Sequence, residues 1–221
     1  MKKIRIMTVA VVLVSMLCMS LSTPHALASS NPGVLPPEAR LQGLTLSEWV
    51  ARMQQIVAIP EPVNPIFHPI SECYFARYGN VGIAPFYFES GSSSCTMPAG
   101  MMLHVNVIVY VCLSTMGDGD TEKELRACAE SLVTANLQAS IDGVSVGDLS
   151  QYADTSPLFT LVFTEDNIFA LPAGPSDGVA NGVTFITTPL SPGQHTIHVH
   201  GEAPDFGGFV YDWTYYITVT P

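Results

Sequence analysis

Three histidines lie close together near the carboxyl end of the chain, at His195, His198 and His200. In a β-strand the side chains alternate between two faces, so His198 and His200 share one face and stand about 7 Å apart along the strand. Neutral imidazoles at this spacing can bind one transition metal ion, and copper and zinc suit imidazole ligands. With His104 and Asp212 as further ligands, the stretch predicts a small copper or zinc site.

The same histidines have a purely structural interpretation, as part of one strand of a hairpin. If the apolar face of this strand matches that of the last strand of the chain, Val199 pairs with Trp213 and His200 lies opposite Asp212. A cross-strand pair of this kind stabilises a sheet by about 0.2–1 kcal/mol without any metal. A metal site needs a third ligand from elsewhere in the chain, so the cross-strand pair is the favoured interpretation.

Acidic residues offer a different chemistry, the cleavage of glycosidic bonds by paired carboxylates. Glu202, Asp205 and Asp212 lie near one predicted loop, and Glu89 lies in another. Such catalysis needs two carboxyl groups roughly 5–10 Å apart. Spacing in the sequence does not fix that separation, so a carboxylate-dependent hydrolase is kept as a third hypothesis.

Aromatic residues are concentrated in the segment 74–88. They are Tyr74, Phe75, Tyr78, Phe86, Tyr87 and Phe88. An exposed row of aromatic rings would suit sugar rings or a protein partner, whereas a buried row would be part of the core. The buried row is the favoured interpretation, and an exposed one would indicate a recognition surface.

Composition narrows the class of protein that must position these residues. The chain has 221 residues, of which 48% are hydrophobic and 12% charged, with 8 Lys and Arg against 19 Asp and Glu. The high apolar and low charged content argues against a disordered chain. The formal net charge of −11 argues against a nucleic-acid binder, which needs a basic face, and self-repulsion favours a monomer.

The amino terminus has the profile of a secretory signal peptide. Lys2, Lys3 and Arg5 precede an apolar run over about 7–22, and small residues at 26 and 28 suit a cleavage site. The apolar run is shorter than the roughly 20 residues that cross a bilayer. We therefore expect 1–28 to be removed and the protein to be secreted, extracellular or periplasmic, without a stable membrane anchor.

The cysteines agree with an exported protein. Beyond the signal peptide they form an even set, Cys73, Cys95, Cys112 and Cys128. Four cysteines allow three pairings. Their order in the chain suggests Cys73–Cys95 and Cys112–Cys128, and each bridge would stabilise the fold by about 3 kcal/mol in the chain-entropy model.

Two helices are predicted beside a flexible lead-in. The proline-rich segment 29–44 predicts the lead-in. Thr45 and Glu48 have the spacing of a capping box, and the apolar face that follows predicts a helix over about 45–58. The same spacing recurs before a second predicted helix, over about 121–134.

The remainder of the chain is rich in strands. Apolar residues recur with a period of two or in short runs between turn residues. These segments are 81–88, 101–112, 137–141, 144–146, 158–163, 167–171, 183–190, 195–200 and 211–220. They predict a single mainly β domain over 45–221, an antiparallel β-sandwich that is Ig-like or jelly-roll-like, with a leading and an inserted helix.

Several short stretches together resemble a family of uncharacterised secreted bacterial proteins that are rich in β-structure. They include the helix that ends at Ile59-Pro60, the run from Cys95 to Gly100, Ile141-Asp142-Gly143, the run from Leu190 to His198, and the run from Thr214 to Val219. The resemblance covers most of the chain beyond the signal peptide. It implies export and a β-rich fold, and it implies no catalytic residues.

We therefore expect a secreted, non-enzymatic β-sandwich that acts as an extracellular binding or interaction module. Its partner would be an extracellular ligand or protein rather than a nucleic acid. The alternatives are the copper or zinc protein and the carboxylate-dependent hydrolase. As a binding or interaction module, the protein is expected to have no cofactor.

Overall fold

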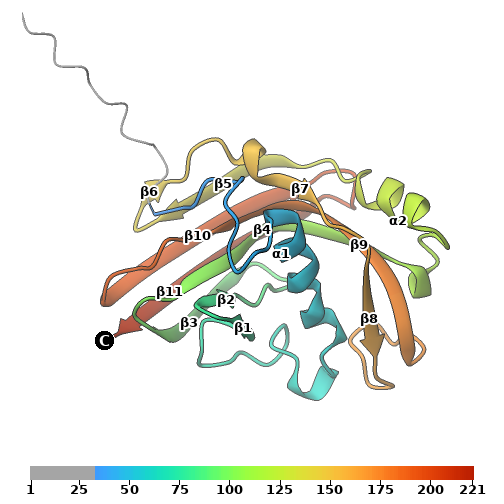
Figure 1. Cartoon of the computed structure of the whole chain (residues 1–221), viewed down its shortest axis with the longest axis horizontal. Helices are drawn as coiled ribbons and strands as arrows, with labels where there is room; N and C mark the ends of the chain where they lie inside the picture. Colours follow the sequence, from blue (N-terminus) through green and yellow to red (C-terminus); the bar gives the residue numbers. More distant parts are fainter. Residues whose placement is uncertain (1–32) are drawn as a thin grey trace, which may run out of the picture.

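Two β-sheets that face each other form the body of the molecule (Figure 1). The computed structural model describes residues 33–221, and the predicted signal peptide lies outside them. The first sheet has the order β1-β2-β4-β9-β7, with β8 also paired to β9. The second has the order β3-β11-β10-β5-β6. The mainly β sandwich predicted from the sequence is confirmed.

The strands have the following bounds. The first sheet contains β1 (Ala76–Tyr78), β2 (Val81–Ile83), β4 (Met102–Leu113), β7 (Ala153–Thr155), β8 (Phe159–Phe163) and β9 (Gly174–Ile186). The second sheet contains β3 (Gly91–Pro98), β5 (Ala135–Ile141), β6 (Val144–Ser145), β10 (Gly193–Ala203) and β11 (Phe209–Thr220).

The sandwich is not antiparallel throughout. The pairs β2–β4 and β3–β11 are parallel, and the other strand pairs are antiparallel. Both parallel pairs involve the strands on either side of the segment 84–90, which carries the chain from the first sheet to the second. The sequence predicts a strand over 81–88, but β2 ends at Ile83. Pro85 in this segment ends the strand, because proline has no N–H for a strand ladder.

Both predicted helices are present. The first is α1 (Leu46–Met53), which continues as a 3-10 helix over Gln54–Ala58. Its capping box has the predicted form, since the Thr45 backbone N–H donates to Glu48 Oε2 at 2.7 Å. The second, α2 (Glu122–Ala129), starts as predicted and ends five residues early. Further 3-10 turns lie at Glu61–Val63, Ser114–Met116 and Leu149–Tyr152.

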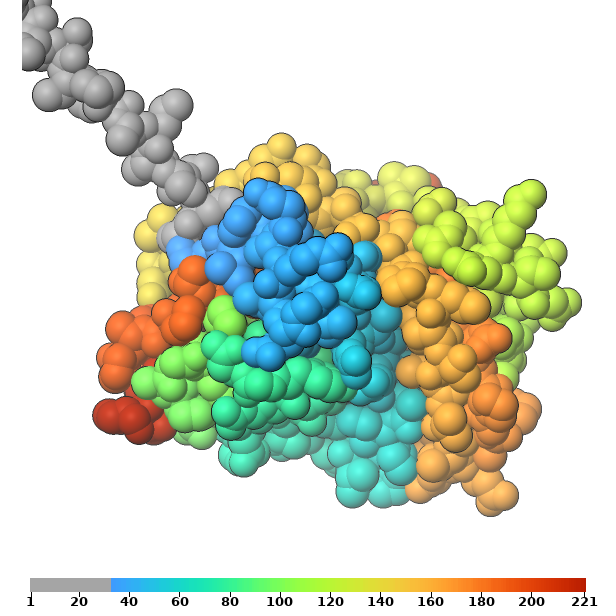
Figure 2. All heavy atoms as spheres, viewed as in Figure 1, coloured from blue at the N-terminus to red at the C-terminus, as the bar shows by residue number. Residues whose placement is uncertain are grey.

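Helix α1 covers the outer face of the first sheet and lies in front of β4 and β9 (Figure 1). Its Trp49 side chain is fully buried there. The segment 33–44, which the sequence predicted to be part of a flexible lead-in, packs on the same sheet. Val34 forms a bridge with Thr187, and the Leu35 backbone N–H donates to the Ile186 carbonyl at 2.9 Å. Figure 2 shows this lead-in and α1, in blue, together on the surface of that face.

The predicted register of the final hairpin is confirmed. Val199 pairs with Trp213 and His200 with Asp212 across β10 and β11. Ile197 and Val199 are fully buried between the sheets. Their alternation with the histidines therefore places His198 and His200 on the outer face of the second sheet.

A bulge in β4 changes the expected pattern of alternation. Asn106 pairs with Thr184 and Ile108 with Val183, so Val107 has no partner on β9. An extra residue shifts the alternation by one position. Side chains beyond the bulge therefore lie on the faces opposite to those predicted, and Ile108 points toward the second sheet, against Gly201.

Two segments differ in type from the prediction. Residues 167–171, expected as a strand, form a loop around the Asn167 side chain, which donates to the carbonyls of Thr164 and Leu171 and accepts from the Leu171 N–H. The segment Gly91–Pro98, rich in serine and not predicted, forms strand β3 at the edge of the second sheet.

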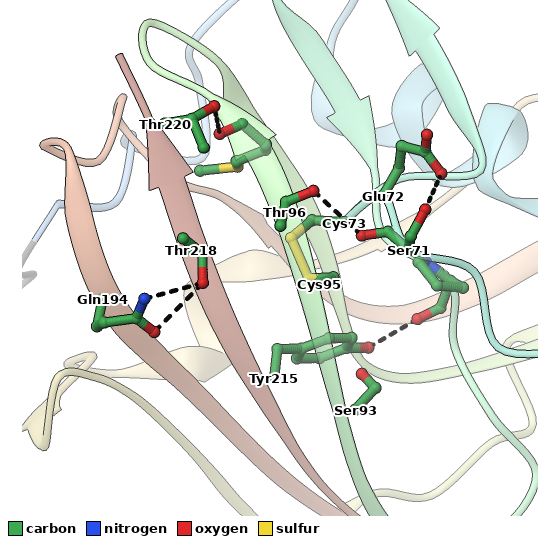
Figure 3. Close-up of a disulfide and its surroundings, with 12 residues drawn as sticks. Ser71, Glu72, Cys73, Ser93, Cys95, Thr96, Gln194, Tyr215, Thr218 and Thr220 are labelled. Atoms are coloured by element: carbon green, nitrogen blue, oxygen red, sulfur yellow. Dashed lines mark hydrogen bonds between the residues drawn. A yellow bond between two sulfur atoms is a disulfide. The ribbon is translucent and has the colours of Figure 1, made fainter.

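Both predicted disulfides are present. Cys73–Cys95 joins the segment before β1 to β3, and Figure 3 shows the bridge with the Thr96 hydroxyl near the Ser71 carbonyl beside it. Cys112–Cys128 joins the end of β4 to α2. Among residues 33–221, no helix has the length and apolar character needed to cross a membrane.

Candidate functional site

The histidines of β10 lie against one carboxylate of β11. His198 Nε2–H donates to Asp212 Oδ1 at 3.2 Å, and His200 Nδ1–H donates to Asp212 Oδ2 at 2.9 Å. Partial burial raises the pKa of Asp212, but the hydrogen bonds from His200 and His198 outweigh it and hold that pKa below its ordinary value. The cross-strand interaction predicted from the register is therefore formed.

The second ring nitrogen of His200 is also occupied. His200 Nε2 lies 3.4 Å from Glu202 Oε1, so both ring nitrogens contact carboxylates. A metal at this position would have to displace one of these contacts. Among residues 33–221, the group of three metal-ligating side chains with donor atoms mutually within 4.8 Å is Cys112, Asp118 and Cys128, whose two sulfurs form a disulfide. Copper or zinc binding by the histidine face stays a prediction.

His104 does not join the other predicted ligands. It lies in β4 of the first sheet, fully buried, with its ring centroid 6.1 Å from that of Trp49 in α1. His198 and His200 lie on the outer face of the opposite sheet, so both sheets separate them from His104. The sequence could not reveal this separation, since it depends on which sheet each strand joins.

The carboxylates of the hydrolase hypothesis have different surroundings. Glu202 and Asp212 both contact His200. Glu89 and Asp205 are exposed in loops. Glycosidase activity of these residues stays a prediction.

His195 forms a separate pair with Asp142 at the β5–β6 turn. His195 Nδ1–H donates to Asp142 Oδ2 at 2.7 Å. The hydrogen bond to Asp142 raises the pKa of His195 above 6.5 despite partial burial. For Asp142, burial raises the pKa, and the hydrogen bonds from His195 and the Thr196 N–H lower it below 3.8 overall.

The variant Asp142→Asn tests this pair. Asn tolerates the positive φ of 51° at this position. The contribution of His195 to the free energy of unfolding is complete below pH 6.5 and is lost as pH rises through its raised pKa. The contribution of Asp142 to the same quantity is lost as pH falls through its lowered pKa. Urea unfolding should show an advantage of wild type over the variant of up to about 1 kcal/mol at pH 5.5 that shrinks by pH 9. An NMR titration midpoint of His195 below 6.5 would contradict the pairing.

The aromatic segment divides into a buried and an exposed part. Tyr87 is 7% exposed and stacks on Trp213 with ring centroids 3.9 Å apart, as core residues do. Phe88 is 40% exposed and contacts Phe67, which is 47% exposed, at a centroid distance of 6.0 Å. The favoured interpretation of a buried row is therefore wrong for Phe88, which belongs to an exposed apolar surface.

Phe88 borders a groove along β4, which we call the β4 groove. Its floor is the stretch Ile108–Val111 of β4, and its volume is about 290 Å³. One wall consists of Gln54, Val57, Phe86, Phe88 and Phe169. The other wall consists of Ala203 at the end of β10, Phe206 in the turn that follows and Phe209 at the start of β11, and Met116, Asp118 and Leu132 close one end. The β4 groove is thus lined almost entirely by apolar and aromatic side chains.

The floor of the β4 groove is an unpaired strand edge. Strand β2 pairs with β4 only at Met102–His104, so the stretch beyond lacks a neighbour on that side. Ala180 of β9 is the residue paired with Val111. Its carbonyl accepts from the Ser156 N–H, directly after β7, so it faces away from β4 and does not bond to Val111. Because backbone groups alternate along a strand, Ile108 and Tyr110 bond to β9, and Val109 and Val111 direct their N–H and C=O groups into the β4 groove.

Two polar side chains modify the β4 groove. Gln54 is 1% exposed; its Nε2–H donates to the Val50 carbonyl at 3.4 Å, and its Oε1 accepts no hydrogen bond from residues 33–221. Asp118 Oδ2 accepts the Leu113 backbone N–H at 2.9 Å at the closed end. Burial and the nearby Asp118 carboxylate raise the pKa of Tyr110, so its hydroxyl stays protonated at neutral pH.

Sequence reasoning missed the β4 groove. Its walls come from segments that are far apart in the chain, around 54–57, 86–88 and 203–209. The available signal was Pro85, which ends β2 after three residues beside a strand of twelve. A strand so much longer than its neighbour leaves part of its edge without a partner.

Comparison with known proteins gives little further information. No protein-family model and no curated protein matches the chain. A solved structure titled "Structure of PbICP-C in complex with falcipain-2" is similar over 64% of this chain and 100% of that chain, with 11% sequence identity and a TM-score of 0.25. A TM-score this low carries no argument about the function of this chain.

Proposed function

We propose that the protein is a secreted, non-enzymatic binding module and that its ligand binds in the β4 groove. The observation that carries the proposal is the groove itself, an open apolar surface on a disulfide-bonded sandwich. Concave sites lined mainly by apolar and aromatic side chains with a few polar groups are where ligands bind, because the bound ligand removes apolar surface from water.

Secretion is part of the same proposal. Two disulfides support folding in an oxidising compartment, where such bonds persist. The acidic composition, with a formal net charge of −11, supports a partner that is neutral or basic at its contact surface. Both observations suit an extracellular or periplasmic interaction module.

The experiment screens two libraries with three forms of the protein. A phage-displayed library of random peptides and a glycan array are each probed with wild type, Val109→Asp and Val162→Asp. Val109→Asp puts a charge on the floor of the β4 groove, whereas Val162 lies on β8, 68% exposed and outside the groove. Val162→Asp is therefore a matched control for the added charge.

We expect ligands that bind wild type and Val162→Asp equally and lose at least 100-fold in affinity for Val109→Asp. Burial of an unpaired carboxylate against an apolar ligand costs several kcal/mol, which accounts for this loss. Failure of both screens, or ligands whose affinity is the same for all three forms, would overturn the proposal.

A further inference from the structure

We infer that the ligand of the β4 groove is an extended polypeptide segment of another protein, which adds to the free edge of β4 as a further strand. The inference rests on the proposed function and names the class of ligand. It follows from the backbone geometry of the floor, from the composition of the walls and from the charge of the protein.

The first step is the backbone of the floor. Val109 and Val111 present outward N–H and C=O groups at the spacing of a strand ladder, and none of the hydrogen bonds within residues 33–221 uses them. The ladder is filled on both sides of this gap. The Ala84 N–H donates to the His104 carbonyl at 3.0 Å, and Asp118 accepts the Leu113 N–H at 2.9 Å. Only another extended backbone supplies both donors and acceptors at this repeat.

The second step is the composition of the two walls. Side chains of an added strand alternate between the walls, and both walls are apolar and aromatic. Phe206 lies on one side, with its ring centroid 5.1 Å from that of Tyr110, and Phe88 lies on the other. A segment buried on both faces is apolar at consecutive positions rather than at every second one. The free Oε1 of Gln54 adds one acceptor for a donor of the ligand.

The third step is charge. Asp118 closes one end of the β4 groove, and the chain has 19 acidic against 8 basic residues. Basic residues beside the apolar run would be attracted to this surface, and acidic ones would be repelled. The ligand is therefore an apolar run of a few residues with basic flanks.

The floor suits a single segment rather than a second copy of this chain. The edge of β4 lies between two walls of side chains, so another folded sheet with its own layers would meet these walls first. A lone extended segment has no such layers. It fills the β4 groove and pairs with Val109 and Val111.

The test uses a capped, fluorescently labelled peptide with five apolar residues, alternately valine and leucine, between pairs of lysines. Its affinity is measured by fluorescence polarisation at 150 mM salt, which screens contacts at long range. A matched peptide carries N-methyl groups on two consecutive central residues, one of which must face β4 in any register. Charge and composition are otherwise the same.

Two variants test the protein side. Val111→Pro removes an outward N–H and leaves the bonds to β9, as is tolerated in an edge strand. Val111→Ala keeps the N–H and trims the side chain. We expect at least a tenfold loss of affinity on N-methylation. Val111→Ala measures the part of any loss that comes from the side chain, and the loss with Val111→Pro should exceed it at least tenfold, because each lost hydrogen bond leaves a partner unpaired.

Equal affinity of the parent and N-methylated peptides would overturn strand addition, and this arm does not depend on the folding of a variant. Equal affinity of wild type and Val111→Pro would do the same. If the groove binds glycans in the screens and not this peptide, the inference fails and the proposed function stands; if nothing binds in either experiment, both fail. A dimer in analytical ultracentrifugation that Val111→Pro abolishes would replace the peptide with a second copy of the chain and overturn the inference.

Discussion

Acidification should destabilise the protein through His104, and the variant His104→Gln should lose this sensitivity. The imidazole is fully buried in the first sheet, and burial lowers its pKa from 6.5 to about 3. Below pH 6.5 the unfolded chain binds a proton at this residue and the folded protein does not. Stability should therefore fall by about 1.4 kcal/mol per pH unit between these two values.

The measurement is urea unfolding of wild type and His104→Gln at pH 6.5 and 4.5. Gln keeps a partner for the Thr184 hydroxyl, which lies 2.9 Å from His104 Nε2. Lowering the pH should cost wild type about 2 kcal/mol more than the variant, and other titrating groups cancel in the comparison. An equal cost in both proteins would mean that His104 is protonated in the folded state.

The second large effect concerns the bridge between β4 and α2. Replacing both Cys112 and Cys128 by Ala should lower the free energy of unfolding by about 3 kcal/mol, because the bridge closes a loop with a sequence separation of 16. For a domain of this size, the melting temperature should fall by about 6–12 °C. Calorimetry of the oxidised proteins measures this difference.

The Cys73–Cys95 bridge provides the comparison, since its sequence separation of 22 predicts a similar loss for the matching double variant. A reductant should then destabilise each double variant only by the amount that belongs to its remaining bridge. A loss below about 1 kcal/mol for Cys112→Ala with Cys128→Ala would show that α2 keeps its place without the bridge.

The final hairpin was predictable because its two faces differ in chemistry. In β10 the buried residues Ile197 and Val199 alternate with histidines, so a slip by one residue would expose the apolar set. The two disulfides also followed from order along the chain. In the hairpin a local pattern was sufficient, because the alternative register would expose apolar side chains.

The bulge in β4 left no such trace in the sequence. Both faces of the first part of β4 are buried, one under α1 and one under the second sheet, so apolar residues occur on either side of Val107. A shift of one residue then exposes nothing. Strand β3 was not predicted because it has too few apolar residues, and an edge strand rich in serine shows no apolar alternation.

The candidate site was the least predictable part. His198, His200 and Asp212 come together as their register indicated, but His104 belongs to the other sheet. The β4 groove depends on where the segment 84–90 leaves the edge of β4 and on where Phe206 is placed by the β10–β11 turn. Contacts between such distant segments are fixed by the fold as a whole and not by local spacing.

Amide hydrogen exchange at Val109 and Val111, resolved by NMR, tests the binding of a ligand on the free edge of β4 most directly. In the protein alone these two amides should exchange much faster than those of Ile108 and Tyr110, which bond to β9. With the lysine-flanked apolar peptide, both should become protected, while the amide of Val162 on β8, which lies outside the β4 groove, is unchanged. Protection of Val109 and Val111 in the protein alone, or no change with a peptide that binds, would contradict the account.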